Sequence, residues 1–111
     1  DGMTALHVAA GAGQQEVIVA LTVIGADPNA RTLAGQAPLH LAVELGEAAS
    51  VNTLLRVHAD IEARDELGRT PLHAAVLSRK PELLVLLCGI RADIGARTND
   101  GATALHLAAG S

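Results

Sequence analysis

The chain has 111 residues and a net charge of −4, so it is long enough for one domain and lacks the basic excess typical of nucleic-acid-binding proteins. It contains no Phe, Trp or Tyr, and any core must be built from Leu, Val, Ile and Ala. A single cysteine, Cys88, excludes an intrachain disulfide and fits a reducing compartment, so we expect a cytoplasmic or nuclear protein. The longest apolar run, residues 83–88, is far shorter than the ~18 residues that a membrane span requires.

A tetrapeptide recurs at a constant interval of 33 residues, which indicates a stack of similar structural units. The copies begin at residues 4, 37, 70 and 103 and read Thr-Ala-Leu-His, Ala-Pro-Leu-His, Thr-Pro-Leu-His and Thr-Ala-Leu-His. This spacing predicts one domain over residues 1–111, with repeats at about 1–33, 34–66 and 67–99 and a partial repeat at 100–111. We expect an excerpt of a longer chain, because solenoids need polar terminal repeats and neither end resembles one.

The second repeat illustrates the elements that we expect in chain order. Pro38 fits the first turn of a helix, which Gly46 ends, and residues 39, 42 and 43 form its apolar face. A second helix is predicted over residues 48–57, and residues 59–68 contain the turn formers and charges of an exposed, hairpin-like loop. Helices shorter than ~12 residues are marginal in water, so packing between repeats must stabilise them.

At these residues the chain resembles the ankyrin-repeat family. The pattern of the family stands here as Gly-Met-Thr-Ala-Leu-His-Val-Ala-Ala at residues 2–10, Gly-Gln-Gln-Glu-Val-Ile at residues 13–18 and Gly-Ala-Asp-Pro-Asn-Ala at residues 25–30, and the match covers the whole chain without insertion. The resemblance implies an all-α ankyrin-repeat solenoid of stacked antiparallel helix pairs with projecting β-hairpin-like loops. It also implies a protein partner, held on a concave face by loop tips and inner helices, and no catalysis.

Four positions depart from the family pattern. Ala37 replaces a helix-capping threonine, at a cost of about 1 kcal/mol. His58 and Arg91 replace a turn glycine, and we expect Arg91 to strain its turn by about 1 kcal/mol. Arg79 stands where the two earlier repeats have glycine. We therefore expect the third repeat to be the least stable.

The sequence offers no convincing catalytic, cofactor or metal site. One histidine recurs in each repeat: His7, His40, His73 and His106. Packed helices lie ~8–10 Å apart, which is too far for this row of histidines to share a zinc ion. The resemblance implies that each histidine instead forms hydrogen bonds that fix the loop and connect it to the next repeat. We expect Cys88 to be buried and inert, and residues 11–13 lack the Lys-Ser/Thr of a phosphate-binding loop. The resemblance also suggests that Asn29 could be hydroxylated, as in some cytosolic members.

Partner-binding candidates follow from the loop and inner-helix positions that the resemblance implies. They are Arg31, Leu33, Gln36, Leu45, Arg64, Glu66, Leu67, Arg69, Leu77, Arg97 and Asn99. The arginines at 31, 64 and 97 repeat at an interval of 33, so three aligned guanidiniums could grip carboxylates or phosphates, or could simply be solvated. The leucines are apolar at sites expected to be exposed, which suits an interface, although single exposed leucines are ordinary.

The resulting hypothesis is a non-catalytic scaffold or adaptor module, a monomeric fragment that binds a protein and no nucleic acid, membrane or metal. The alternative is a cis-regulatory ankyrin domain of a larger enzyme or channel, because Val19, Val23 and Val85 are apolar where the outer helices usually carry polar residues. A nucleic-acid binder that uses the arginine row is a weaker reading, and it predicts binding that falls steeply with salt. An enzyme is least favoured, since no nucleophile is paired with a base.

Overall fold

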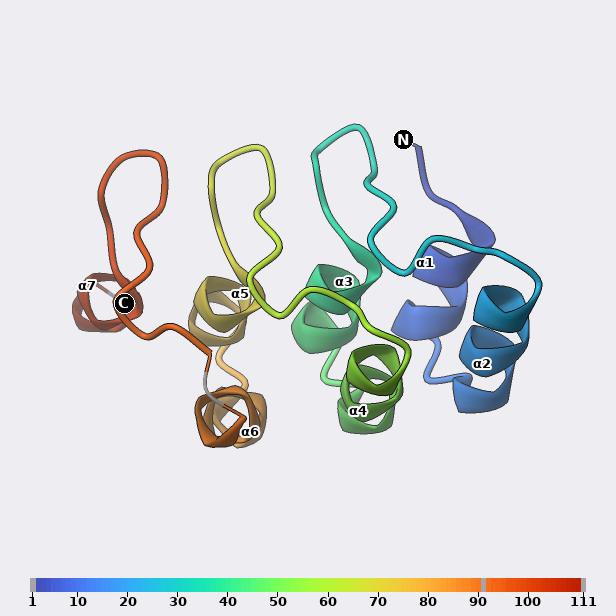
Figure 1. The fold of residues 1–111 in the computed structure, drawn as a ribbon. Coiled ribbons are helices and arrows are strands. Elements are labelled where there is room, and N and C mark those ends of the chain that lie inside the picture. The colour runs from blue at the N-terminus through green and yellow to red at the C-terminus, as the bar shows by residue number, and fades with distance from the viewer. Residues whose placement is uncertain (1, 91, 111) are drawn as a thin grey trace.

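The structure is a computed structural model that describes residues 2–90 and 92–110, and these residues form seven α-helices and no strand. The helices are α1 (Ala5–Gly11), α2 (Gln15–Val23), α3 (Pro38–Glu44), α4 (Ala48–Arg56), α5 (Pro71–Leu77), α6 (Pro81–Gly89) and α7 (Ala104–Ala109). Figure 1 shows α1, α3, α5 and α7 in one row, α2, α4 and α6 in a second row, and a narrow loop rising above each of α3, α5 and α7. The dimensions of 41 × 26 × 19 Å and the two helical layers confirm the predicted all-α solenoid. Within the described part, no helix is long and apolar enough to cross a membrane.

The inner helices begin at a reciprocal cap made by the recurring Thr-x-x-His sequence. The hydroxyl of Thr4 accepts the backbone N–H of His7, and the imidazole Nδ1 of His7 accepts the backbone N–H of Thr4 at 3.1 Å. The same pair of bonds opens α5 and α7. At the start of α3 only the imidazole half remains, from the Ala37 N–H to Nδ1 of His40 at 3.1 Å, because alanine has no hydroxyl. Each cap satisfies N–H groups that a helix start otherwise leaves unpaired.

The turns of the second and third repeats contain two left-handed residues that are not glycine. Arg79, between α5 and α6, has a φ of 54°, and the glycines in the equivalent turns have φ values of 71° and 74°. His58, after α4, has a φ of 73°. A side chain in this region costs about 1–2 kcal/mol, although histidine tolerates it better than most residues, so the turn at Arg79 is the more strained of the two. Arg91 lies outside the described residues.

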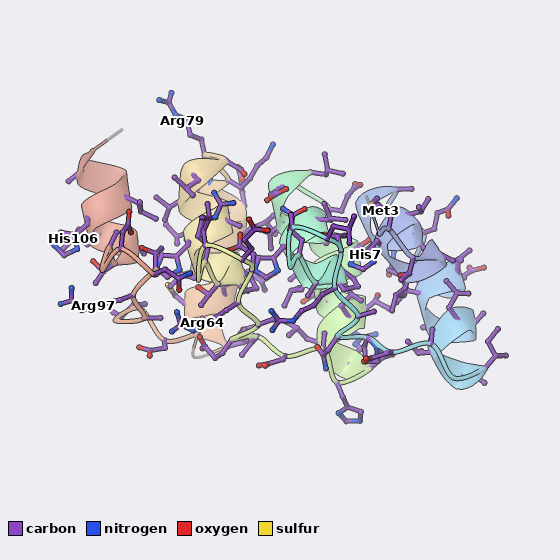
Figure 2. The ribbon with its side chains drawn as sticks, turned by 90° about the horizontal axis from the view of Figure 1, so that it is seen from above. Met3, His7, Arg64, Arg79, Arg97 and His106 are labelled. Carbon is purple, nitrogen blue, oxygen red and sulfur yellow. The ribbon has the colours of Figure 1, made fainter. Side chains whose placement is uncertain are left out.

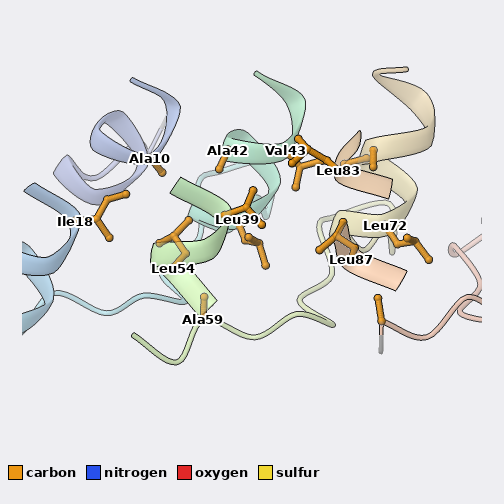
Figure 3. Close-up of a cluster of buried hydrophobic side chains, with 14 of the residues drawn as sticks. Ala10, Ile18, Leu39, Ala42, Val43, Leu54, Ala59, Leu72, Leu83 and Leu87 are labelled. Atoms are coloured by element: carbon orange, nitrogen blue, oxygen red, sulfur yellow. The ribbon is translucent and has the colours of Figure 1, made fainter. Parts of the chain in front are cut away.

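An aliphatic cluster of buried side chains lies between the two rows of helices (Figure 3). Its largest fully buried apolar side chains are Leu6, Ile18, Leu39, Leu54, Leu72 and Leu87. No helix is longer than nine residues, so the helices depend on this packing, in which each buried side chain contributes about 1.5–3 kcal/mol.

The outer helices are not equally well attached. Helix α4 packs on α1, α2 and α3, whereas among the described residues α6 has a substantial contact only with α5. Side-chain size differs at the matched positions of the two repeats. Ala10 on α1 and Ser50 on α4 are both fully buried, and the equivalent positions one repeat later carry the larger Val43 on α3 and Leu83 on α6, which are also buried. Interhelix distance increases with the size of the side chains in the contact, and the larger residues of the later repeat agree with the looser attachment of α6.

Helix α6 also contradicts the expected burial of Cys88. The helix buries Leu83 and Leu87, and in the described part of the chain it packs substantially on α5 alone. Cys88 is therefore exposed, as is Val85, three residues earlier on the same face. The prediction failed because an apolar helix was assumed to be covered on all sides.

Candidate protein-interaction surface

The three loops above the inner helices are hairpins with the same internal hydrogen bonds. Each is closed at its neck by one backbone bond, and these bonds run from Thr32 to Gln36 at 3.0 Å, from Asp65 to Arg69 at 3.0 Å and from Thr98 to Ala102 at 2.8 Å. A left-handed glycine turns the chain at each tip, where its N–H donates at 2.9 Å to the carbonyl three residues earlier. The repeated sequence thus builds the same projecting loop three times.

A side chain at the neck locks each hairpin. Thr32 and Thr98 use their hydroxyls to accept the N–H four residues later. In the middle hairpin Asp65 accepts the backbone N–H of Arg69 and the guanidinium Nε–H of Arg69, at 2.9 and 2.8 Å. Burial works to raise the pKa of Asp65, but the hydrogen bonds and positive charge of Arg69 outweigh it, and this pKa lies below its ordinary value.

Neighbouring hairpins are bonded to one another. The N–H of Glu66 donates to the carbonyl of Ala34 at 3.0 Å, and the N–H of Asn99 donates to the carbonyl of Leu67 at 2.9 Å. The side-chain amide of Asn99 also donates to the carbonyl of Glu66 at 2.9 Å. A Cβ on Gly68 would lie 2.7 Å from the backbone nitrogen of Asn99, so glycine is required for this close approach. The hairpins therefore form one preformed edge.

The arginine row holds this edge together from its side. The guanidinium of Arg31 donates to the carbonyl of Arg64, and that of Arg64 donates to the carbonyl of Arg97 at 2.5 Å. Figure 2 shows Arg64 and Arg97 beside the loops, and Arg79 on the opposite side of the molecule. The sequence analysis expected the three arginines either to bind an anion or to be solvated, and it did not predict these hydrogen bonds between hairpins. Arg31, Arg64 and Arg97 are nevertheless exposed, and each guanidinium has five N–H donors.

The histidine row anchors the hairpin necks to the inner helices, as the resemblance implied. Because Nδ1 accepts a backbone N–H, Nε2 must carry the proton. That proton is donated by His7 to the carbonyl of Gln36 at 2.8 Å and by His40 to the carbonyl of Arg69 at 2.7 Å. His73 instead reaches the carbonyl of Ala96 at 2.9 Å. Burial is the main cause that lowers the pKa of His40 below its ordinary value near 6.5, which keeps its imidazole neutral.

An apolar pocket lies between the second and third hairpins, above the inner helices. Its volume is about 300 Å³, and it is lined by Leu67, Arg69, Leu77, Thr98, Asn99, Asp100 and Leu107. Four of these seven were predicted partner-binding residues: Leu67, Arg69, Leu77 and Asn99. The fold brings Asn99 beside Leu77, although the two are 22 positions apart in the sequence. Leu107, Thr98 and Asp100 were not predicted, although Leu107 occupies the same repeat position as Leu41. The pocket combines apolar walls with a polar rim, the arrangement that suits a hot spot for binding.

The remaining predicted residues extend this face toward α1. Leu33 and Gln36 line a second pocket of about 290 Å³ with Met3, Thr32 and Ala34. The amide of Gln36 donates to the carboxylate of Glu44 at 2.9 Å, and burial is the main cause that raises the pKa of Glu44. The predicted leucines are all exposed, with exposed fractions of 80% for Leu33, 60% for Leu45, 54% for Leu67 and 45% for Leu77. We call the face that carries both pockets and these leucines the inner surface.

Other candidate sites have structural partners. The side-chain oxygen of Asn29 accepts the N–H of Asp60 at 2.7 Å, and Glu62 does the same for Asp93 one repeat later at 2.8 Å. These bonds link successive outer loops, so Asn29 has a structural role that the sequence patterns did not predict. Across residues 2–90 and 92–110, no three His, Cys, Asp or Glu side chains are grouped so that they could hold a metal ion.

Comparison with known families agrees with this architecture. The family described as ankyrin repeats (3 copies) matches residues 1–65 and 39–111, which together span the chain. The chain therefore belongs to the ankyrin-repeat family. Ankyrin repeats are generally protein–protein interaction modules and typically have no catalytic activity. A search among curated proteins found no match to this chain.

Proposed function

We propose that the chain is a scaffold or adaptor module that binds a partner protein on its inner surface, as a monomer and without a cofactor. The observation that carries the proposal is the pocket between the second and third hairpins, in which Leu67 and Leu77 provide exposed apolar anchors and Arg69 and Asn99 provide a polar rim. Exposed apolar groups in a pocket with a polar rim are typical of the energetic centre of protein interfaces.

Preorganisation supports the proposal. The bonds between hairpins and the histidine bonds at their necks hold the backbone of the inner surface before any partner arrives. Little ordering entropy would then oppose association, and small apolar anchors can supply useful affinity. In this mechanism, Arg31, Arg64 and Arg97 align the loops and offer their remaining donors to carboxylates of the partner.

The test is capture of proteins from a cell extract by the wild-type chain and by variants with single charged substitutions. We expect Leu67→Asp and Leu77→Asp to abolish capture, because each puts a carboxylate into the pocket. Val23→Asp is the matched control, since Val23 is an exposed aliphatic residue of α2, outside the pocket. A protein that is retained equally by all three variants would refute binding through the inner surface. Simultaneous substitution of the three arginines is a poorer test, because it also removes the bonds that align the hairpins.

The exposed outer valines favour a second candidate, a cis-regulatory domain packed against another part of a larger enzyme or channel. Val23 is 78% exposed and Val85 is 71% exposed, and both lie on the outer row of helices. Under this candidate, Val23→Asp and Val85→Asp would change the activity of the larger protein, whereas Leu67→Asp would not.

We also propose a cytoplasmic or nuclear location. The exposed thiol of Cys88 would persist in a reducing compartment, whereas a free exposed thiol is uncommon in an oxidising one. Imaging of the parent protein with a fluorescent tag tests this location, and secretion would contradict it.

A further inference from the structure

The outer layer of helices contains a groove that the proposed function does not use. It lies where α4 and α6 end, has a volume of about 430 Å³, and is lined by Asn52, Leu55, Arg56, Ala59, Ile61 and Ile90. Among the described residues, α4 and α6 have no substantial contact with one another. The corresponding helices one repeat earlier, α2 and α4, pack directly on one another.

The walls and the polar side of the groove differ in character. Leu55, Ile61 and Ile90 form apolar walls and are only partly covered. Asn52 and Arg56 are one turn apart on α4, so both project from the same face of that helix. An amide and a guanidinium in this arrangement present several N–H donors beside the apolar walls.

These donors have no partner in the described part of the chain. The one ion pair among the described residues joins Arg69 and Asp65, and no carboxylate lies within ion-pair distance of Arg56 there. Glu16 lines a neighbouring pocket on the other side of Arg56 without reaching that distance. Arg56 and Asn52 are both exposed, so their N–H groups are accessible to a ligand, and the position of Arg56 in the last turn of α4 also suits the helix dipole.

We propose that this groove is a second docking site, which binds an acidic segment of another protein that presents an aliphatic side chain next to a carboxylate. The aliphatic side chain packs between Leu55, Ile61 and Ile90, and the carboxylate accepts hydrogen bonds from Arg56 and Asn52. A planar guanidinium binds a carboxylate through paired N–H groups, which makes a carboxylate the matching ligand for Arg56. The site is on the outer layer, so it can be occupied independently of the inner surface.

The experiment is a titration of the isotopically labelled chain, followed by the backbone amide signals in NMR spectra. The probe is N-acetyl-leucine, which carries an aliphatic side chain beside a carboxylate, and the uncharged control probe is N-acetyl-leucine amide. Ligands of this size bind with dissociation constants of roughly 1 mM. We expect N-acetyl-leucine to shift the amides of Leu55, Arg56 and Ile90, and the uncharged amide to bind about fivefold more weakly.

Two variants test the assigned contacts. Arg56→Met keeps the length of the side chain and removes its charge, and Ile90→Ala removes an exposed apolar wall, so both should weaken binding of N-acetyl-leucine about three- to tenfold. Arg79→Met is the matched control, because Arg79 precedes α6 at the end opposite to the groove. Amide spectra of each variant alone establish that it is folded. Equal affinity for the two probes, no shifts in the groove, or unchanged binding by Arg56→Met would each overturn the proposal.

Discussion

The Ala37→Thr substitution should stabilise the protein by completing the one incomplete cap among the inner helices. Thr4 and Thr70 occupy the equivalent positions, and their hydroxyls accept a histidine N–H and approach the imidazole Nδ1 at 2.8 and 2.9 Å. Thr70 is fully buried, as is Ala37, which shows that the fold accommodates the larger side chain at this position. The new hydroxyl would contact His40 in the same way.

The expected gain in the free energy of unfolding depends on the hydrogen bonds that His40 already makes. Replacement of a capping threonine by alanine usually costs about 0.5–2 kcal/mol. Here the backbone N–H of His40 donates to the carbonyl of Ala37 at 3.1 Å, so it is not left unpaired in the present chain. We therefore expect a gain near the lower end, about 0.5–1 kcal/mol, which corresponds to roughly 2–6 °C in melting temperature for a chain of this size.

Urea unfolding followed by circular dichroism at the helical band measures this change, because the chain has no aromatic residue that could report by fluorescence. Thr70→Ala is the reciprocal variant and should lower the free energy of unfolding by a similar amount. If Ala37→Thr leaves the urea midpoint unchanged or lowers it, the hydroxyl contacts seen at Thr4 and Thr70 do not stabilise the helix starts, and the cap argument is wrong.

Three further predictions concern the turns, the hairpins and pH. Arg79→Gly should raise the free energy of unfolding by about 1 kcal/mol in urea titrations, because Arg79 has a φ of 54°, whereas Gly46→Ala should lower it, since Gly46 has a φ of 74°. Gly68→Ala should lower it by about 2 kcal/mol and speed amide exchange in the hairpins, because its Cβ would meet Asn99 and its φ is 77°; unchanged exchange would contradict the close approach. The urea midpoint should fall as pH drops below about 6.5: burial lowers the folded-state pKa of His40, so the unfolded state binds more protons, and the stabilisation present above its ordinary pKa is lost below it. A midpoint that stays constant as pH falls from neutral to below this value would refute that account.

The local structure of each repeat could be predicted from its own residues. The helix expected over residues 48–57 is α4 at Ala48–Arg56, and the helix expected to open at Pro38 is α3. The incomplete cap at Ala37 and the left-handed turn at Arg79 also agree with the sequence reading. These features depend on short-range geometry, in which one residue type fits a backbone position that others fit poorly.

Contacts between repeats limited the prediction of the candidate sites. The four exposed leucines were found because repeat position alone separates core from surface. The bonds from Arg31 to Arg64 and from Arg64 to Arg97 were missed, because they depend on how far one hairpin stands from the next. The sequence of a single hairpin does not indicate how far it lies from its neighbour.

By itself, the sequence determined the repeat length, the order of the helices, the places where they start and turn, and membership of the ankyrin-repeat family, because the 33-residue period and its short motifs act within each repeat. Only the tertiary structure decided which faces stay uncovered. Cys88 is exposed and a groove opens beside Arg56, because among the described residues α6 packs substantially on α5 alone. The spacing of α6 from α4 depends on packing between repeats, and the residues of each helix fit that helix equally well at a closer or a wider spacing.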